Sequence, residues 1–377
     1  MNILLITPGI SKKYNDNYFA YNFMAQSGNK ILAISQRENI NKGKGTEINQ
    51  KFESDGNILI HRVFETLKQQ NSLIFQILKF YKIKNIIKDF KPDIIFCEEL
   101  SNLNLAIKIK KKFNIPLVLR VEFTYNKDYP YRTLGRFLNF FKFRLTGDHF
   151  PIIIGKLIWK WATKNSDSII SCYFEDSTRE LKNYNLKKTY YVAWPTFLPD
   201  FESEIKNYNR IIFAGSFEKH KNLKELKITI PLLIENTHIN EVYIVGTGED
   251  EKIIEDLKKK YPNNIFHIKS LGRNECLKLI SSSCFSYSPA TSGGWGFIGD
   301  SFAAKTPVIF SHNHYGFNDN IDSIFAKPDE IDKRVNEIYN DKDLYEKISL
   351  GGHERFIKNH TAEGVGRRFI EICSELC

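Results

Sequence analysis

Continuous apolar runs alternate with helix-spaced stretches along the first half of the chain. A run that is apolar at successive positions is typical of a strand buried on both faces of a parallel sheet, whereas apolar residues three or four apart indicate a helix. The runs predict strands over residues 2–7, 30–35, 58–63, 94–97 and 116–123. The stretches between them predict helices over residues 17–26, 72–90 and 103–113. This alternation predicts a doubly wound α/β domain.

The pattern changes over residues 37–57 and again over residues 131–164. The first segment is polar and rich in Lys, Asn and Gly, so we expect a loop or an excursion there. The second is aromatic and basic, and it has two interpretations. It is either a pair of core helices or a surface that docks on anionic lipid through residues 132–161. Beyond it, strands are predicted over residues 168–172 and 190–193, and a helix over residues 175–183.

A second α/β domain is predicted from residue 210 onward. One buried strand ends before Gly215, and another, over residues 241–245, ends before a tight Gly-Thr-Gly turn. A segment with prolines and acidic residues precedes this domain and indicates a linker. We therefore expect domains over residues 1–200 and 201–358, with a helix over about residues 359–377 that packs back on the first domain.

Residues 283–310 combine a buried strand, a glycine-rich loop, a short helix and a second strand. Gly293, Gly294 and Gly296 keep side chains off the loop, so backbone N–H groups and the positive end of the helix can bind an anion such as a diphosphate. Asp300, one turn into the helix, suits a pair of sugar hydroxyls. The alternative is a glycine-rich turn that binds nothing.

A glycine and several carboxylates follow strands of the first sheet, at the edge where parallel sheets bind ligands. These residues are Gly9, Glu98, Glu99 and Glu122. A carboxylate in such a place is costly unless it is used or paired, so we consider all four positions for ligand binding or catalysis. The alternative is that the carboxylates pair with basic residues such as Arg120.

Composition and charge narrow the classes of partner. The 377 residues are 42% apolar and 26% charged, which is ordinary for a globular chain. The formal net charge of +10 favours phosphate-bearing partners: nucleotides, anionic lipid or nucleic acid. We do not expect nucleic-acid binding, because the lysines are spread along helix faces and no known module is apparent.

The six cysteines contain no C-x-x-C pair, which fits a reducing compartment and argues against a zinc site. No signal peptide or membrane span is apparent, so we expect a cytoplasmic chain, peripheral to the membrane if residues 132–161 dock there. His312 and His314 follow a strand without other ligand residues nearby, and we expect them to be solvated loop histidines.

Three segments of the second domain carry a resemblance to a known family. They read AGSFEKHKN (residues 214–222), VGTGE (245–249) and SPATSGGWGFIGDSFAAKTPVI (288–309). They resemble, in the same order, the strand-Gly-Arg-Leu-x-x-x-Lys-Gly, V-G-x-G-x and P-x-x-x-E-G-F-G-x-x-x-x-E-A-x-A-x-G-x-P-V-I motifs of the GT-B glycosyltransferases of family four. The resemblance is continuous over about residues 208–340 and weaker over the first domain.

This resemblance implies two Rossmann-like domains that face each other across a cleft, with a nucleotide-diphosphate sugar bound to the second. By position, Lys221 would hold the diphosphate, the amides around residues 295–297 would receive phosphate or sugar, and Asp300 would bind the ribose. The donor-binding candidates are Gly215, Ser216, Lys221, Gly246, Arg273, Gly294, Trp295, Gly296, Phe297 and Asp300. The catalytic candidates are Glu122 and Lys221, and the acceptor-binding candidates are Gly9, Glu98 and Glu99.

The sequence departs from the family at three places. Ser216 stands where the family has a phosphate-binding Arg, the first Glu of a carboxylate pair falls on Ser292 or Gly293, and Glu122 replaces a frequent His. We expect a hexosyltransferase-like enzyme that moves a sugar, with retention, to a glycan or lipid-linked acceptor in cell-surface polysaccharide or glycoconjugate synthesis. No metal or cofactor is expected, because a lysine and a helix N-terminus can stabilise the leaving diphosphate. The alternatives are a sugar-nucleotide epimerase on the same fold and a non-catalytic subunit that binds sugar nucleotides.

Overall fold

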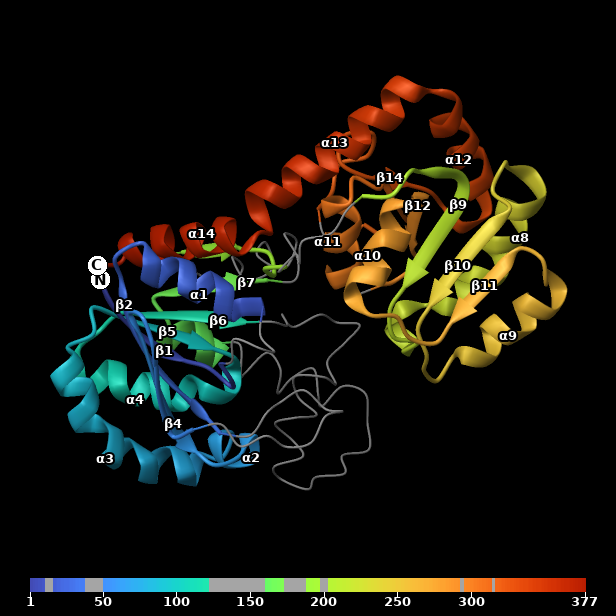
Figure 1. Ribbon diagram of the computed structural model, residues 1–377. Helices are drawn as coiled ribbons and strands as arrows, with labels where there is room; N and C mark the ends of the chain where they lie inside the picture. The colour runs from blue at the N-terminus through green and yellow to red at the C-terminus, as the bar shows by residue number, and fades with distance from the viewer. Residues whose placement is uncertain are drawn as a thin grey trace. The chain divides into compact units, whose positions relative to one another are not determined.

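The computed structural model describes residues 1–10, 16–37, 50–121, 160–172, 188–196, 203–291, 295–313 and 316–377. These residues form two compact units (Figure 1). Unit 1 contains residues 1–195 and 362–377, and unit 2 contains residues 196–361. Each unit has a sheet with helices on its faces, so the α/β class with two doubly wound domains is confirmed.

The eight described strands of unit 1 form one sheet in the order β3-β4-β2-β1-β5-β6-β7-β8. Its strands are β1 (Asn2–Ile6), β2 (Lys30–Gln36), β3 (Phe52–Asp55), β4 (Ile58–Phe64), β5 (Ile94–Glu98), β6 (Leu117–Val121), β7 (Ser168–Ser171) and β8 (Thr189–Tyr191). The helices with printed bounds are α1 (Asp16–Gln26), α2 (Leu67–Gln70), α3 (Leu73–Phe90), α4 (Leu103–Phe113) and α14 (Ala362–Ser374). Only the β3–β4 pair is antiparallel among these strands.

The alternation of side chains along β1 explains why its residues are apolar at every position. Leu4 and Ile6 join the core that α3 and α4 cover, whereas Ile3 and Leu5 join the core that α1 and α14 cover. Helix α14 lies along α1 (Figure 1), and a Cβ built on its Gly366 would lie 2.7 Å from the carbonyl oxygen of Ala20. Because α14 follows unit 2 in the sequence, unit 1 is built from two separate parts of the chain.

The loop expected over residues 37–57 is partly wrong, because its end forms strand β3. The ring of Phe52 stacks on His61 of β4, and Glu53 forms an ion pair of 2.7 Å with Arg62. These cross-strand contacts stabilise a polar strand that has no apolar run of its own. Residues 38–49, the predicted helix over 175–183 and the end of the predicted strand over 116–123 lie outside the described residues.

The described strands of unit 2 form a parallel sheet in the order β11-β10-β9-β12-β13-β14. Its strands are β9 (Asn207–Ala214), β10 (Glu241–Val245), β11 (Ile265–Ile268), β12 (Ser283–Ser288), β13 (Val308–Phe310) and β14 (Ile324–Phe325). Its helices are α8 (Leu226–Asn236), α9 (Glu251–Lys260), α10 (Arg273–Ser281), α11 (Trp295–Ala303), α12 (Ile331–Asn340) and α13 (Lys342–Asn359). One core contains apolar residues of α8, α9, α12 and α13, and a smaller cluster includes residues of α10 and α11.

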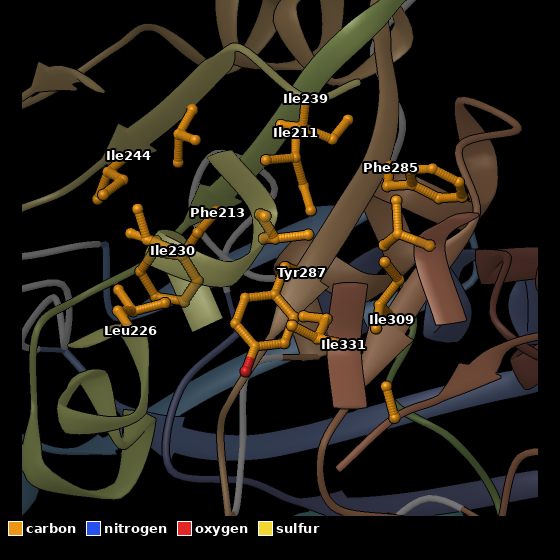
Figure 2. Packing of buried hydrophobic residues seen from close by; sticks show 14 of the residues in the cluster. Ile211, Phe213, Leu226, Ile230, Ile239, Ile244, Phe285, Tyr287, Ile309 and Ile331 are labelled. Carbon is orange, nitrogen blue, oxygen red and sulfur yellow. The ribbon is translucent and has the colours of Figure 1, made fainter. Parts of the chain in front are cut away.

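Figure 2 shows the larger core of unit 2, with side chains from its strands and from α8 and α12. Tyr287 of β12 lies among these apolar side chains, and its hydroxyl points out of the cluster. A buried hydroxyl of this kind needs a hydrogen-bond partner, and that partner belongs to the candidate site described below.

Each sheet has one topological switch point, where the strand order reverses. In unit 1 the point lies between β1 and β5, and in unit 2 it lies between β9 and β12. Ligands of doubly wound sheets bind beyond the carboxyl ends of the strands at such points. The residues that follow β1, β5, β9 and β12 are therefore candidates for ligand binding.

Candidate active site

Two segments with predicted donor-binding residues follow the strands on either side of the switch point of unit 2. Gly215 and Ser216 directly follow β9, and the segment that begins at Pro289 follows the neighbouring strand β12 and leads to α11. Ser216 is exposed, and Gly215 has a φ of 156°. The predicted donor-binding residues on these two segments thus follow the two strands that flank the switch point. Gly294 itself lies outside the described residues.

The turns after β9 and β10 pack backbone against backbone. A Cβ built on Gly246 would lie 1.9 Å from the carbonyl oxygen of Gly215, a distance that no real side chain can adopt. The N–H of Phe217 also donates to the carbonyl of Thr247 at 2.9 Å. Gly246 therefore has a structural reason to be glycine in this protein, and that reason needs no ligand.

Lys221 lies on a short 3-10 turn, Lys219–Lys221, that follows the β9 loop, and only 9% of the residue is exposed. Asn222 follows it with a φ of 53°, and a second 3-10 turn, Leu223–Glu225, leads into α8. The two 3-10 turns therefore connect the loop after β9 to α8, and Lys221 lies at the end of the first turn.

Glu225 connects these two turns to the carboxyl ends of β12 and β13. Its buried carboxylate accepts hydrogen bonds from Asn222 Nδ2 at 2.8 Å, from the Tyr287 hydroxyl at 2.5 Å and from the Ser311 hydroxyl. His312 Nε2 lies 3.2 Å from the same carboxylate. Burial and the nearby carboxylate raise the pKa of Tyr287 well above its usual value, so the phenol stays protonated and donates.

Sequence reasoning missed Glu225. In the sequence it is one polar residue at the start of a helix, and nothing local indicates that it is buried. Its partners Tyr287 and Ser311 are 62 and 86 residues away. The prediction that His312 is a solvated loop histidine is only partly right, because its side chain is 43% exposed but contacts Glu225; His314 lies outside the described residues.

Helix α11 begins at Trp295, whose side chain is held within unit 2. The indole Nε1 donates to Thr196 Oγ1 at 3.0 Å, and the ring stacks on His360 with centroids 3.7 Å apart. Gly296 is exposed, and a Cβ built there would meet no atom within 4 Å. Phe297 packs edge-on against Phe213 of β9. The side chain of Trp295 therefore positions the start of the helix, and Gly296 leaves the surface beside it open.

Asp300, on the second turn of α11, forms an ion pair with Arg273, the first residue of α10. The distance from Arg273 Nη2 to Asp300 Oδ1 is 3.0 Å. The side chain of Asp300 is 14% exposed and that of Arg273 is 38% exposed. Burial and the Asp300 charge raise the pKa of the neighbouring Cys276 thiol to about 11. The structure thus brings together two residues that the sequence placed separately among the donor-binding candidates.

At the switch point of unit 1, Glu98 lies at the centre of a buried network. Its carboxylate accepts hydrogen bonds from the Thr7 and Tyr21 hydroxyls and pairs with Arg120 Nη1 at 2.5 Å. Burial and the Glu98 charge raise the pKa of Tyr21 well above its usual value. The alternative interpretation of Glu98, pairing with Arg120, is therefore confirmed.

Arg120 is buried between aromatic rings. Its guanidinium lies 4.7 Å from the ring centroid of Trp194 and 5.2 Å from that of Phe369 on α14. Burial opposes its charge, but the paired Glu98 carboxylate favours it, and the net direction of the pKa of Arg120 is upward. Within the described part of the chain its Nε and Nη2 have no hydrogen-bond partner. This arginine depends on Glu98 for compensation of its charge.

Glu99 is half-buried and has a φ of 70° and a ψ of 143°. This backbone conformation is rare for residues other than glycine and costs about 1–3 kcal/mol where the surrounding structure imposes it. Its N–H donates to the carbonyl of Arg120 at 2.9 Å. The carbonyl oxygen of Gly9, which follows β1, lies 3.0 Å from Thr7 Oγ1, the hydroxyl that donates to Glu98. The third carboxylate, Glu122, lies outside the described residues.

Most of the aromatic and basic stretch over residues 131–164 lies outside the described residues. Only its end, from Lys160 onward, is described. In the ranges given above, no helix has the length and apolar character needed to cross a membrane. Nor do any three His, Cys, Asp or Glu side chains of those ranges gather closely enough to hold a metal ion.

Solved structures with the same architecture cover the whole chain. They include sucrose-phosphate synthase from Thermosynechococcus elongatus (TM-score 0.68, 12% identity, 100% of this chain and 99% of that chain). HepE from Anabaena in complex with UDP is similar (TM-score 0.66, 11% identity, 100% of both chains), as is a glycosyltransferase from Rickettsia africae (TM-score 0.62, 13% identity, 100% of this chain and 98% of that one). No curated protein matches the chain in sequence. The fold is that of the GT-B glycosyltransferases, with two Rossmann-like domains.

The match to a sequence model of a protein family falls within unit 2. Residues 198–355 match the sequence model of the family described as "Glycosyl transferases group 1", and this range covers most of unit 2. Unit 2 is therefore similar to the glycosyl transferases group 1 family, and the protein is a glycosyltransferase with the GT-B fold.

Proposed function

We propose that unit 2 binds a nucleotide-diphosphate sugar at the switch point between β9 and β12. The observation that carries this proposal is topological: the segment that begins with Gly215 after β9 and the glycine-rich segment after β12 flank the switch point, where doubly wound sheets bind such ligands. HepE from Anabaena, which has this fold, has been solved with UDP and with UDP-glucose. Those ligands support a sugar nucleotide as the donor without identifying the sugar or the base for this chain.

In the proposed complex, the donor diphosphate binds to Lys221 and to backbone N–H groups at the start of α11. A helix N-terminus carries a partial positive charge, and together with a lysine it stabilises the charge that develops as the nucleotide leaves. Asp300 accepts hydrogen bonds from the ribose hydroxyls while Arg273 balances its charge. Gly215, Ser216 and Gly246 line the approach to the diphosphate.

The acceptor binds to unit 1 in this proposal, near Gly9 and Glu99. Glu98 contributes indirectly, because its carboxylate is engaged with Arg120, Tyr21 and Thr7. Glu122 remains the catalytic candidate of this unit. We propose a glycan or lipid-linked acceptor, transfer with retention, and a role in cell-surface polysaccharide or glycoconjugate synthesis. The proposed docking of residues 132–161 on an anionic membrane would bring such an acceptor to the enzyme.

A panel of nucleotide sugars tests the proposal directly. Purified protein should be stabilised thermally by its own donor and should hydrolyse that donor slowly in the absence of acceptor. Lys221→Ala should weaken donor affinity about 10- to 150-fold, the loss expected when a hydrogen bond to a charged group is removed. Lys224→Ala is the matched control, because Lys224 is exposed three residues further on and should leave affinity unchanged.

The same panel separates the alternatives. Conversion of the donor into its epimer without acceptor would identify an epimerase. Donor binding without hydrolysis or transfer to any acceptor would identify a non-catalytic subunit, which the serine at position 216 permits. Absence of binding to every nucleotide sugar would overturn the proposed donor site.

A further inference from the structure

Helix α3 of unit 1 exposes an unusual number of large apolar side chains. Six of the seventeen exposed large apolar residues of the described chain lie within nine residues of this helix. They are Leu73, Ile74, Phe75, Ile77, Leu78 and Tyr81. Single exposed apolar residues are normal on a protein surface, but a contiguous group indicates a binding surface.

The most exposed of these residues point away from the core. The buried residues of α3 are Gln76, Phe80, Ile83 and Ile87, which fixes the face that packs on unit 1. Ile74, Leu78 and Tyr81 are 64%, 58% and 60% exposed, and their spacing of four and three residues places them together on the opposite face. A surface helix normally carries polar residues on that face, so packing in the core of unit 1 does not explain why this strip is apolar.

Lysines surround the apolar strip. Lys82, Lys84 and Lys88 are exposed on the second half of α3, and Lys68 is exposed on the preceding helix α2. On the neighbouring helix α4, Lys108 Nζ lies 4.8 Å from the ring centroid of Tyr81. The sole acidic residue of α3 is Asp89, near its end. Long lysine side chains beside an apolar strip are the composition of a helix that lies in a membrane interface.

We propose that α3 docks unit 1 on an anionic phospholipid surface. The apolar side chains of its first half enter the interface, and the lysines of its second half contact lipid phosphates. The charge pattern decides against a second copy of the chain as the occupant, because two identical lysine-rich faces would repel each other. This surface consists of other residues than 132–161, and its binding to lipid does not depend on the proposed donor site.

Co-sedimentation of the full chain with vesicles tests this proposal. The wild type should bind vesicles that contain phosphatidylglycerol and phosphatidylcholine, and it should bind pure phosphatidylcholine much more weakly. The triple variant Ile74→Ser, Leu78→Ser, Tyr81→Ser should lose binding by at least about 100-fold, because each side chain no longer buries apolar surface. Lys82→Gln, Lys84→Gln, Lys88→Gln should lose about 100-fold on anionic vesicles, at the contribution expected for each basic residue near the surface.

Leu350→Ser with Ile357→Ser is the matched control, since these residues of α13 are 50% and 52% exposed and lie in unit 2. This control should bind vesicles like the wild type. Circular dichroism checks that every variant is folded, and the lysine variant keeps the test decisive if the serine variant unfolds. Wild-type vesicle binding by both α3 variants would overturn the proposal, and so would a dimer that only the serine variant dissociates.

Donor affinity, measured without lipid, separates this proposal from the proposed function. Both α3 variants should bind the donor like the wild type, because they change only the surface of unit 1. A wild type that binds vesicles but no nucleotide sugar would overturn the donor site and leave the α3 proposal standing. A wild type that binds donor but no anionic vesicle would overturn the α3 proposal and leave the donor site standing.

Discussion

The two sheets differ in the residues that follow their strands at the switch points. In unit 1, the edge between β1 and β5 is filled by a buried carboxylate, Glu98, with Arg120, Tyr21 and Thr7 bound to it. In unit 2, β9 leads into a loop that begins with Gly215, and β12 leads into a glycine-rich segment. The charged pair near these segments, Arg273 and Asp300, is partly exposed.

This difference shows how two domains of similar topology can divide their tasks. The side chains of Arg120 and Glu98 are 2% and 7% exposed, so this buried ion pair offers little charge to a ligand. Backbone N–H groups and a partly exposed pair remain able to bind one. The comparison supports the proposal that the anionic donor binds to unit 2, and that unit 1 offers its acceptor a prearranged surface rather than a free charge.

The largest expected effect concerns the closed edge of unit 1. Glu98→Leu should lower the free energy of unfolding by about 3–5 kcal/mol, because it leaves the charge of Arg120 buried without a partner. Urea unfolding measures the change. The double variant Glu98→Leu, Arg120→Met should recover most of the loss, since it removes both charges. Glu363→Ala, which removes an exposed ion pair with Arg367, should cost at most about 1 kcal/mol.

If Glu98→Leu lowers the free energy of unfolding no more than Glu363→Ala does, the contrast drawn between the two switch points is wrong. That result would mean that the Arg120 charge is compensated in another way, and the carboxylate would again be a candidate for direct contact with the acceptor.

The second prediction separates two glycines of unit 2. Gly246→Ala should lower the free energy of unfolding by about 2–4 kcal/mol, because the new methyl group would overlap the carbonyl of Gly215 and the backbone φ of 140° disfavours alanine. Thermal or urea unfolding measures this loss, which is expected without any nucleotide present.

Gly296→Ala is the matched control for stability, since its methyl group has open space. This variant should fold like the wild type, whereas its donor affinity should fall about tenfold or more if the diphosphate approaches the backbone there. Equal donor affinity of Gly296→Ala and the wild type would indicate that the diphosphate does not contact this turn.

A third prediction concerns Asp300 and the ribose. Asp300→Asn should weaken donor binding by about 1.5–3 kcal/mol, the range for hydrogen bonds to a charged group. Calorimetric titration with the donor and with its 2′,3′-dideoxy form completes a double-mutant cycle. The wild type should discriminate strongly against the dideoxy donor, and the variant only weakly.

Arg273→Gln is the control for the ion pair, because it removes the partner of Asp300 and leaves the carboxylate in place. It should affect discrimination between the two donors less than Asp300→Asn does. If the losses from Asp300→Asn and from the dideoxy donor are fully additive, then Asp300 does not contact the ribose.

The smallest effect is expected at Glu99. Glu99→Gly should raise the free energy of unfolding by about 0.5–1 kcal/mol, because glycine adopts a positive φ without the cost that a side chain incurs. Asn114→Gly is the control: its φ is 55°, in the left-handed region that asparagine tolerates, so little change is expected. A more stable Glu99→Gly with a higher KM for the acceptor would assign the carboxylate to the acceptor; lower stability would show that the backbone is not strained.

Local patterns in the sequence predict most of the fold but not the side-chain networks. The apolar run of β1 and the glycine-rich segment before α11 each consist of residues that are adjacent in the sequence, so each pattern is visible there. The partners of Glu98 are not: Thr7 and Tyr21 are 91 and 77 residues away. Sequence could place a carboxylate at the end of β5, but only the fold shows that other side chains bind it. The same is true of Glu225.

The position of α14 has a consequence for the order in which the protein can be completed. Unit 2 is one continuous segment, residues 196–361, and all of it leaves the ribosome before α14 does. Phe369 of α14 packs on Phe96, Tyr21 and Arg120, so the buried network of unit 1 lacks its cover until then. Domains usually fold in the order of synthesis. In this chain the domain whose synthesis begins first is completed last. The part of the apolar face that α14 covers stays open on the nascent N-terminal sheet while the whole of unit 2 is made.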